Sequence, residues 1–219
     1  SASVVEKNIL MVAGHCIKNH PVFDLMSENT IIEISDRVTL DPNIFHKDII
    51  KKIIIHPEWL KTLEEQNGLP TSQREFAKTV DLGFIVLSKD ITSFLPDIKT
   101  AKLDFDKLEV GEEIIVGGYG REIFNQENPR GRLKYAFKKV WRTEYNHFFA
   151  DELDLDGIHY SMAAEGDSGG PVYKFKNGEL VIVGVNSASF GNEKNGTLSM
   201  LKLDGLKDWI EKTLEEYKE

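Results

Sequence analysis

Cysteine is almost missing from this chain, and its scarcity excludes two kinds of structure. Among the 219 residues, Cys16 is the only cysteine. No disulfide can form within the chain, and no metal site can be built from several cysteines. The sequence also lacks an apolar run of transmembrane length, so no membrane partner is expected. Its first residues, SASVVEKNILMVAGHC, lack the charged start and long apolar run of a signal peptide, which is expected to be absent or already removed.

Clusters of basic residues are also missing. Lys and Arg number 27 against 36 Asp and Glu, for a net charge of -9. Because contacts to phosphate need Lys and Arg, no nucleic-acid partner is expected. Apolar residues make up 41% of the chain, which is enough for a substantial core.

Short apolar runs recur along the chain between Gly, Pro and Asn residues. This pattern is typical of strands in a β-sandwich or barrel. The Asn177–Gly178 pair inside the longest run predicts a hairpin turn. The predicted strand regions are residues 8–14, 30–40, 48–57, 81–88, 112–120, 133–145, 170–189 and 196–203.

Two segments depart from the β pattern. Residues 57–79 are polar and partly helix-like, which indicates a long surface insertion; its acidic residues could hold calcium, but a solvated loop is the preferred interpretation. Residues 204–219 predict a helix that docks by one apolar face, with Asp204 as its N-cap. That face consists of Leu206, Trp209, Ile210, Leu214 and Tyr217.

The stretch EGDSGGPVY, residues 165–173, has the composition that a reactive serine requires. A serine hydroxyl is a weak nucleophile, and it needs a general base and donors aimed at the developing oxyanion. Gly166 lets the backbone turn so that its own N–H and that of Ser168 can point at one oxygen. Gly169 and Gly170 let the chain pass close behind Ser168.

The sequence offers six histidines as candidate bases: His15, His20, His46, His56, His147 and His159. His15 ends an apolar run, where a histidine is held rigidly, and Asp81 begins the buried-strand pattern DLGFIVL, where a carboxylate could orient a base. Taken singly, each residue is more often structural. A histidine at a strand end or an aspartate before a strand does not by itself identify a site.

Three blocks in order, MVAGHC, VDLGFIVL and GDSGGPVY, resemble the signature blocks of the trypsin/chymotrypsin family of serine proteases. The order His, Asp, Ser is that family's order and differs from those of subtilisins and α/β-hydrolases. The segments IIIHPEW, IIVGGYG, VGVNSAS and LKDWIEKTL also resemble family segments. The resemblance therefore covers essentially the whole chain.

The resemblance implies an all-β fold of two antiparallel Greek-key barrels with the active site between them, plus a C-terminal helix. Residues 1–104 would form the first barrel, apparently without its first strands, residues 105–203 the second, and residues 204–219 the helix. It implies a serine endopeptidase that acts on proteins or peptides, is secreted or periplasmic, and needs no cofactor or metal.

The roles of individual residues are implied by the same resemblance. Ser168 would be the nucleophile, His15 the general acid and base, and Asp81 the group that orients the imidazole. The N–H groups of Gly166 and Ser168 would form the oxyanion hole. Ser187 matches the family serine that braces the buried aspartate.

The N-terminus departs from the family pattern. Family members begin with a free amino group that inserts beside the aspartate next to the catalytic serine, here Asp167, and no matching Ile-Val-Gly-Gly segment is present. One hypothesis is a zymogen whose cleaved N-terminal segment is linked through Cys16 or was left out. The alternative is a divergent member that activates differently and keeps Cys16 as a buried thiol.

The expected specificity pocket also departs from trypsin. Met162 stands where trypsins place an aspartate, so cleavage after Arg or Lys is not expected. Ser187 and Ser189 are expected on one wall, with Leu198 near the base, which favours a neutral apolar residue before the scissile bond. Glu165 would place a negative charge at the mouth of the cleft.

A function of a different class is a catalytically silent or latent protease homologue that binds a partner protein. Silent relatives usually lose one residue of the triad, whereas this chain retains His15, Asp81 and Ser168. The intact triad therefore favours the enzyme, although a competent triad can still be latent.

Overall fold

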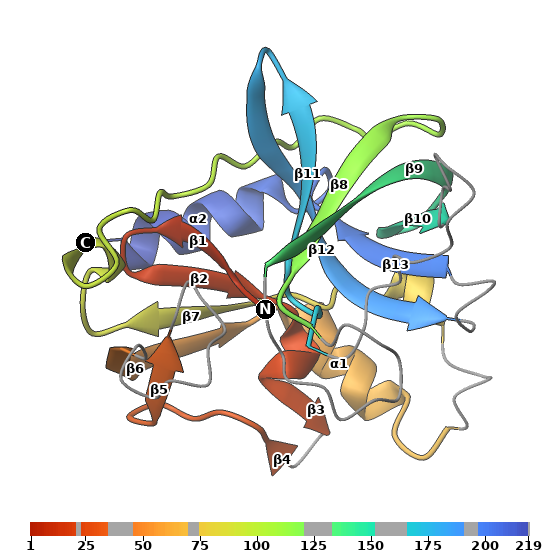
Figure 1. The fold of residues 1–219 in the computed structure, drawn as a ribbon. Coiled ribbons are helices and arrows are strands. Elements are labelled where there is room, and N and C mark those ends of the chain that lie inside the picture. Colours follow the sequence, from red (N-terminus) through yellow and green to blue (C-terminus); the bar gives the residue numbers. More distant parts are fainter. Residues whose placement is uncertain are drawn as a thin grey trace.

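A computed structural model describes residues 1–20, 23–34, 46–69, 75–120, 133–151, 166–190 and 197–218. The described chain is mostly β-structure, arranged as two main sheets with a helix at the C-terminal end (Figure 1). The prediction of an all-β fold with a C-terminal helix is confirmed. The domain boundaries at residues 104 and 203 remain a prediction.

The N-terminal half contains a five-stranded antiparallel sheet. Its order is β1 (Ser3–Glu6), β2 (Ile9–Val12), β7 (Gly83–Leu87), β6 (His46–Ile55) and β5 (Ile31–Ile34). A separate two-stranded sheet joins β3 (Lys18–His20) to β4 (Phe23–Asp24). Every residue of β2 and β7 is buried, because these neighbouring central strands are covered on both faces, and both are therefore apolar throughout.

The C-terminal half contains a closed six-stranded antiparallel barrel. Its order is β10 (His147–Asp151), β13 (Thr197–Lys202), β12 (Glu179–Phe190), β11 (Pro171–Lys176), β8 (Glu113–Gly118) and β9 (Lys134–Glu144). Asn177 and Gly178 join β11 to β12 with φ values of 52° and 82°, as a tight hairpin turn requires. The predicted turn is therefore confirmed.

Two strands of the main sheets were not among the predicted strand regions. β1 has only four residues, and its pairing with β2 defines it. β10 follows β9 through a turn in which Tyr145 has a φ of 44°. Asn146, a common turn residue, lies in this turn, but the residues after it were not predicted to form a strand.

Two α-helices lie within the described ranges of the chain. α1 (Pro57–Glu65) begins the predicted insertion; its first-turn N–H of Glu58 donates to the His56 ring, and Trp59 is buried. α2 (Lys207–Tyr217) lies at the C-terminal end. The predicted N-cap at Asp204 is wrong: the helix starts later, with Leu206 at the cap position and no side-chain cap hydrogen bond. Leu206 itself packs into the core, so burial of the apolar face sets the start of the helix instead of a polar cap.

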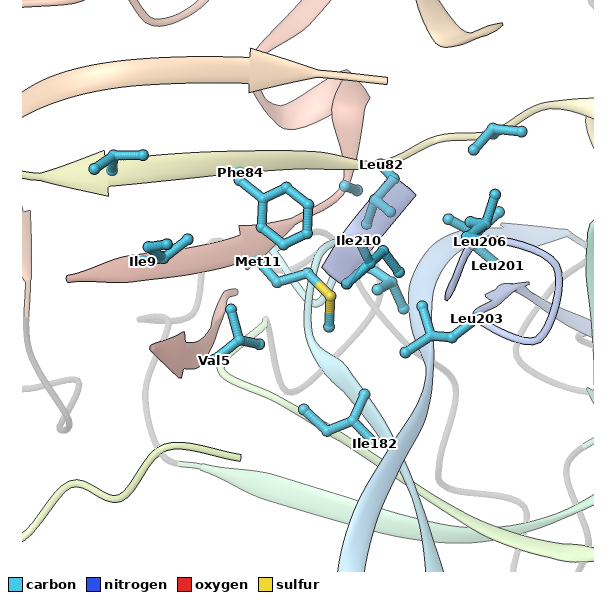
Figure 2. Close-up of a cluster of buried hydrophobic side chains, with 14 residues drawn as sticks. Val5, Ile9, Met11, Leu82, Phe84, Ile182, Leu201, Leu203, Leu206 and Ile210 are labelled. Carbon is cyan, nitrogen blue, oxygen red and sulfur yellow. The ribbon is translucent and has the colours of Figure 1, made fainter. Parts of the chain in front are cut away.

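One core cluster joins the two halves (Figure 2). It combines residues of the first sheet, the barrel and α2, and the predicted apolar face of α2 belongs to it. Phe84 of β7 is fully buried there and stacks on Trp209 of α2, with ring centroids 5.5 Å apart. The shared cluster includes Val5, Ile9, Met11, Leu82, Phe84, Ile182, Leu201, Leu203, Leu206 and Ile210.

We predict that Phe84→Ala lowers the free energy of unfolding by about 3–5 kcal/mol, because it opens a cavity where the sheet, barrel and helix meet. Phe175→Ala is the matched control, since Phe175 is 61% exposed, and it should change stability by no more than about 0.5 kcal/mol. Urea denaturation of both variants measures the difference. Equal losses would contradict this account of the core.

Candidate active site

His15 lies on a short 3-10 turn that directly follows the buried strand β2. The turn, Gly14–Cys16, is closed by bonds from Cys16 N to Ala13 O and from Ile17 N to Gly14 O, both 3.0 Å. A Cβ on Gly14 would lie 2.8 Å from Trp59 Cδ1, so only glycine lets the turn pack against α1. The His15 side chain is 27% exposed and is therefore anchored but accessible.

Asp81 binds His15 through both carboxylate oxygens. Its Oδ1 accepts from the His15 backbone N–H at 2.7 Å, and its Oδ2 lies 2.7 Å from His15 Nδ1. The Ser187 hydroxyl also donates to Oδ2, at 2.6 Å. Since an ionised carboxylate only accepts, His15 Nδ1 carries a proton, and in the neutral imidazole Nε2 keeps the lone pair.

The electrostatics of this pair reinforce its geometry. Burial opposes charge on both groups, but their mutual hydrogen bond and attraction outweigh it, and the neighbouring Cys16 side chain adds to the effect at His15. As a result, the pKa of His15 is raised above its ordinary value and the pKa of Asp81 is lowered. The Ser187 hydroxyl and the backbone N–H of His15 contribute to the lowering at Asp81.

Ser168 lies on a glycine-containing loop of the C-terminal half, and the backbone of this loop packs beside the segment that carries His15. A Cβ on Gly169 would lie 3.0 Å from Ala13 N and 3.3 Å from Val12 Cα, so the loop packs against the segment that leads to His15. Ser168 O also lies 3.8 Å from Cys16 Sγ. In the described part of the chain, no hydrogen bond joins the Ser168 hydroxyl to His15; such bonds often form fully only when substrate binds.

The backbone of this loop is held by its neighbours. Gly169 N donates to Asn186 O at 2.8 Å, and the nitrogen of Ser1 donates to Gly166 O and Ser168 O at 2.9 and 3.0 Å. None of the described residues accepts a hydrogen bond from the N–H of Gly166 or Ser168.

Asp167, next to the serine, turns away toward the strand β8. Its Oδ1 accepts from Gly120 N at 2.7 Å. A Cβ on Gly118 or Gly120 would lie within 2.1–2.5 Å of the Asp167 carboxyl group. Both glycines are therefore needed to admit this carboxylate.

Of the remaining predicted site residues, some are described by the structure and others are not. Ser187 lies beside Asp81, Ser189 is exposed further along β12, and Leu198 is buried in the barrel. Met162 and Glu165 lie outside the described residues, so the shape of the specificity pocket stays a prediction. Cys16 is a free thiol, and its predicted link to another segment is likewise untested.

A second serine–histidine pair was missed by sequence reasoning. His147 Nδ1 lies 2.7 Å from Ser199 Oγ, yet the two residues are only 1% and 0% exposed. No substrate can reach a pair sealed so completely, so it is not an alternative nucleophile. His147 was one of six candidate bases, but only its tertiary burial distinguishes it from His15.

Comparison with protein families decides the identity of this fold. The family model described as Trypsin matches residues 1–210. This chain belongs to the trypsin family. Its sheet, closed barrel and C-terminal helix are the trypsin-like double-barrel fold, and family membership makes it a serine protease by class. A search of curated proteins gives no match.

One further finding concerns the membrane. Within the described ranges of this trypsin-family chain, no helix is long and apolar enough to cross a bilayer. α1 and α2 are the described α-helices, and both are short and amphipathic.

We predict that Gly169→Ala destabilises the protein more than Gly178→Ala does. The two glycines have nearly equal φ values of 81° and 82°, so each substitution carries a backbone cost of about 1–2 kcal/mol. A Cβ at Gly178 meets nothing within 4 Å, whereas at Gly169 it meets Ser1 O at 2.5 Å and Ala13 N at 3.0 Å. Urea denaturation should therefore show a larger loss for Gly169→Ala. Equal losses would mean that the serine loop does not pack tightly against Ser1 and the His15 segment.

Proposed function

We propose that this chain is a serine endopeptidase in which Ser168, His15 and Asp81 form a catalytic triad. The observation that carries the proposal is the pair of hydrogen bonds that His15 donates to buried Asp81, at 2.7 Å on each carboxylate oxygen. It fixes the tautomer that leaves Nε2 as a base. The packing of the Ser168 loop against the His15 segment supports Ser168 as the third residue of the triad.

In the first half of the reaction, His15 Nε2 takes the proton of the Ser168 hydroxyl as Oγ bonds to the substrate carbonyl carbon. The protonated imidazole then gives that proton to the leaving amine as the C–N bond breaks, which leaves an acyl ester on Ser168. Water repeats the sequence: His15 takes its proton, and the ester C–O bond breaks as the proton returns to Ser168. Asp81 stabilises the imidazolium at each stage.

The developing oxyanion needs donors that are not already occupied. The N–H groups of Gly166 and Ser168 fit this requirement, since none of the described residues uses them. Gly166 has a φ of 100°, which only glycine adopts readily, so this residue permits the backbone direction. We assign these two groups to the oxyanion hole.

The proposed substrate is a protein or peptide with a neutral apolar residue before the scissile bond. Support comes from Met162, which replaces the aspartate that trypsins use to bind Arg or Lys. Ser189, near the exposed end of β12, would contact the substrate chain, and Glu165 would favour basic flanking residues. The proposed location is secreted or periplasmic, and the chemistry requires no cofactor.

A second candidate is a latent or silent homologue that acts by binding a partner. The observation that favours it is the missing hydrogen bond between Ser168 and His15 in the described structure. A latent enzyme would share the fold and the His15–Asp81 pair. It would lack an activated serine.

We expect a fluorophosphonate to add once to the native protein, and peptide mapping should place the adduct on Ser168, away from buried Ser199. Ser168→Ala should remain unlabelled and lose roughly four to six orders of magnitude in kcat. Intact mass spectrometry makes the measurement. An unlabelled parent would support the latent homologue, and a variant within tenfold of the parent's activity would exclude Ser168 as nucleophile.

The pH dependence of kcat/KM should follow the protonation of His15. Activity needs the neutral imidazole, so it is lost as pH falls below the pKa of His15, and Asp81 raises that pKa above its ordinary value of 6.5. Asp81→Asn should move the acid limb to lower pH and reduce kcat by about 10⁴-fold. An acid limb that stays in place would show that Asp81 does not set the pKa.

A further inference from the structure

His147 occupies a buried junction between the two halves of the molecule. It begins β10 of the barrel, and its ring reaches Thr79, which lies two residues before Asp81 in the other half. Nε2 lies 3.1 Å from Thr79 O and 3.3 Å from Thr79 Oγ1, while Nδ1 lies 2.7 Å from Ser199 Oγ. Every ring nitrogen therefore has a partner.

These contacts fix the protonation of His147. A carbonyl oxygen can only accept, so Nε2 carries the proton and donates to Thr79 O. Nδ1 then accepts from the Ser199 hydroxyl. Burial lowers the pKa of His147 to about 4, against the opposing effect of its bond to Thr79 and of the nearby Asp81 charge, with Lys202 adding to the lowering. The ring stays neutral at physiological pH.

Asn146, the residue before His147, makes further hydrogen bonds to the segment that precedes Asp81. Asn146 N donates to Ala77 O at 3.0 Å, and Asn146 Nδ2 donates to Lys78 O at 2.9 Å. Together with the bond to Thr79, three consecutive carbonyls, those of residues 77–79, are held by β10 and the turn before it. On the far side of Asp81, the carbonyl of Leu82 accepts from His56 N at 3.0 Å. The segment that carries Asp81 is thus pinned on both sides.

We propose that His147 is a positioning residue that holds Asp81 in register with His15 through the Thr79 carbonyl. This proposal rests on the catalytic role proposed for His15, Asp81 and Ser168. The Asp81 carboxylate serves three donors at 2.6–2.7 Å, so a small slide of its backbone breaks or lengthens at least one of them. The bond from His147 resists that slide from the barrel side.

Packing alone does not account for a polar group at this place. Burying an imidazole and a hydroxyl costs free energy unless both are hydrogen-bonded, and an apolar pair would fill the space without that requirement. What the polar pair adds is direction, since the Ser199 hydroxyl fixes the ring tautomer that points an N–H at Thr79 O. A hydrogen bond that fixes the position of the Thr79 carbonyl also helps to fix the backbone of Asp81, whose carboxylate must meet three donors.

The test compares three variants of the full chain. His147→Leu keeps the volume but removes both bonds, His147→Gln keeps one donor and one acceptor, and His56→Leu is the control. His56 is another buried histidine, 9% exposed, whose ring caps α1 and packs against Trp209. Its hold on Leu82 O comes from the backbone N–H, which leucine keeps. His147→Leu combined with Ser199→Ala removes the orphaned hydroxyl if the single variant folds poorly.

Two readouts separate positioning from general damage. With a peptide substrate, His147→Leu should lower kcat roughly 10–100-fold with little change in KM. Its acid limb should shift to lower pH, because a looser contact with Asp81 stabilises imidazolium less. His147→Gln should restore both properties, and His56→Leu should lose stability without moving the acid limb.

Titration of His15 by NMR of ¹⁵N-histidine-labelled protein does not depend on activity. A pKa for His15 that falls in His147→Leu and recovers in His147→Gln supports the proposal even if the enzyme proves latent. A His15 pKa that is unchanged in the folded leucine variants overturns it. Failure of the parent to label at Ser168, by contrast, would count against the proposed function alone.

Discussion

The buried carboxylate of Asp81 is the constraint on which the rest of the site depends. A charge that is only 2% exposed is costly unless donors surround it, and three donors do so: the His15 backbone, the His15 ring and the Ser187 hydroxyl. Two of these donors belong to the N-terminal half and one to the barrel. Stabilising the charge therefore also brings the two halves into a fixed relation around His15.

The core supplies the rigidity that this arrangement needs. β2 leads to His15 and β7 follows Asp81, and the two strands are neighbours in one sheet with every residue buried. Phe84 lies within this β2–β7 pairing, opposite Met11, and it also packs against α2 together with barrel residues. Packing of the first sheet against the barrel and α2 thus fixes the backbone that carries the His15 and Asp81 side chains.

Close backbone approaches explain why glycine recurs around the serine. Gly169 admits the segment before His15, and Gly118 and Gly120 admit the carboxylate of Asp167. Each position has a neighbour that a Cβ would strike, so these glycines are required by contacts made across the fold. Without a side chain at these positions, the segment before His15, the serine loop and the residues at the end of β8 can pack closely together.

The sequence by itself determined the strand-rich class, the Asn177–Gly178 turn and the apolar face of the last helix, because each depends on a local pattern. It also contained the three short motifs on which the proposed triad rests. It did not reveal β10, because one turn residue, Asn146, does not show that a second strand follows, nor the start of α2, which burial of Leu206 sets in place of a cap at Asp204. It also could not distinguish His147 from the other histidines. Only the tertiary structure decided that His15 meets Asp81 while His147 is sealed against Thr79 and Ser199, since burial and hydrogen-bond partners arise from segments up to 68 residues apart.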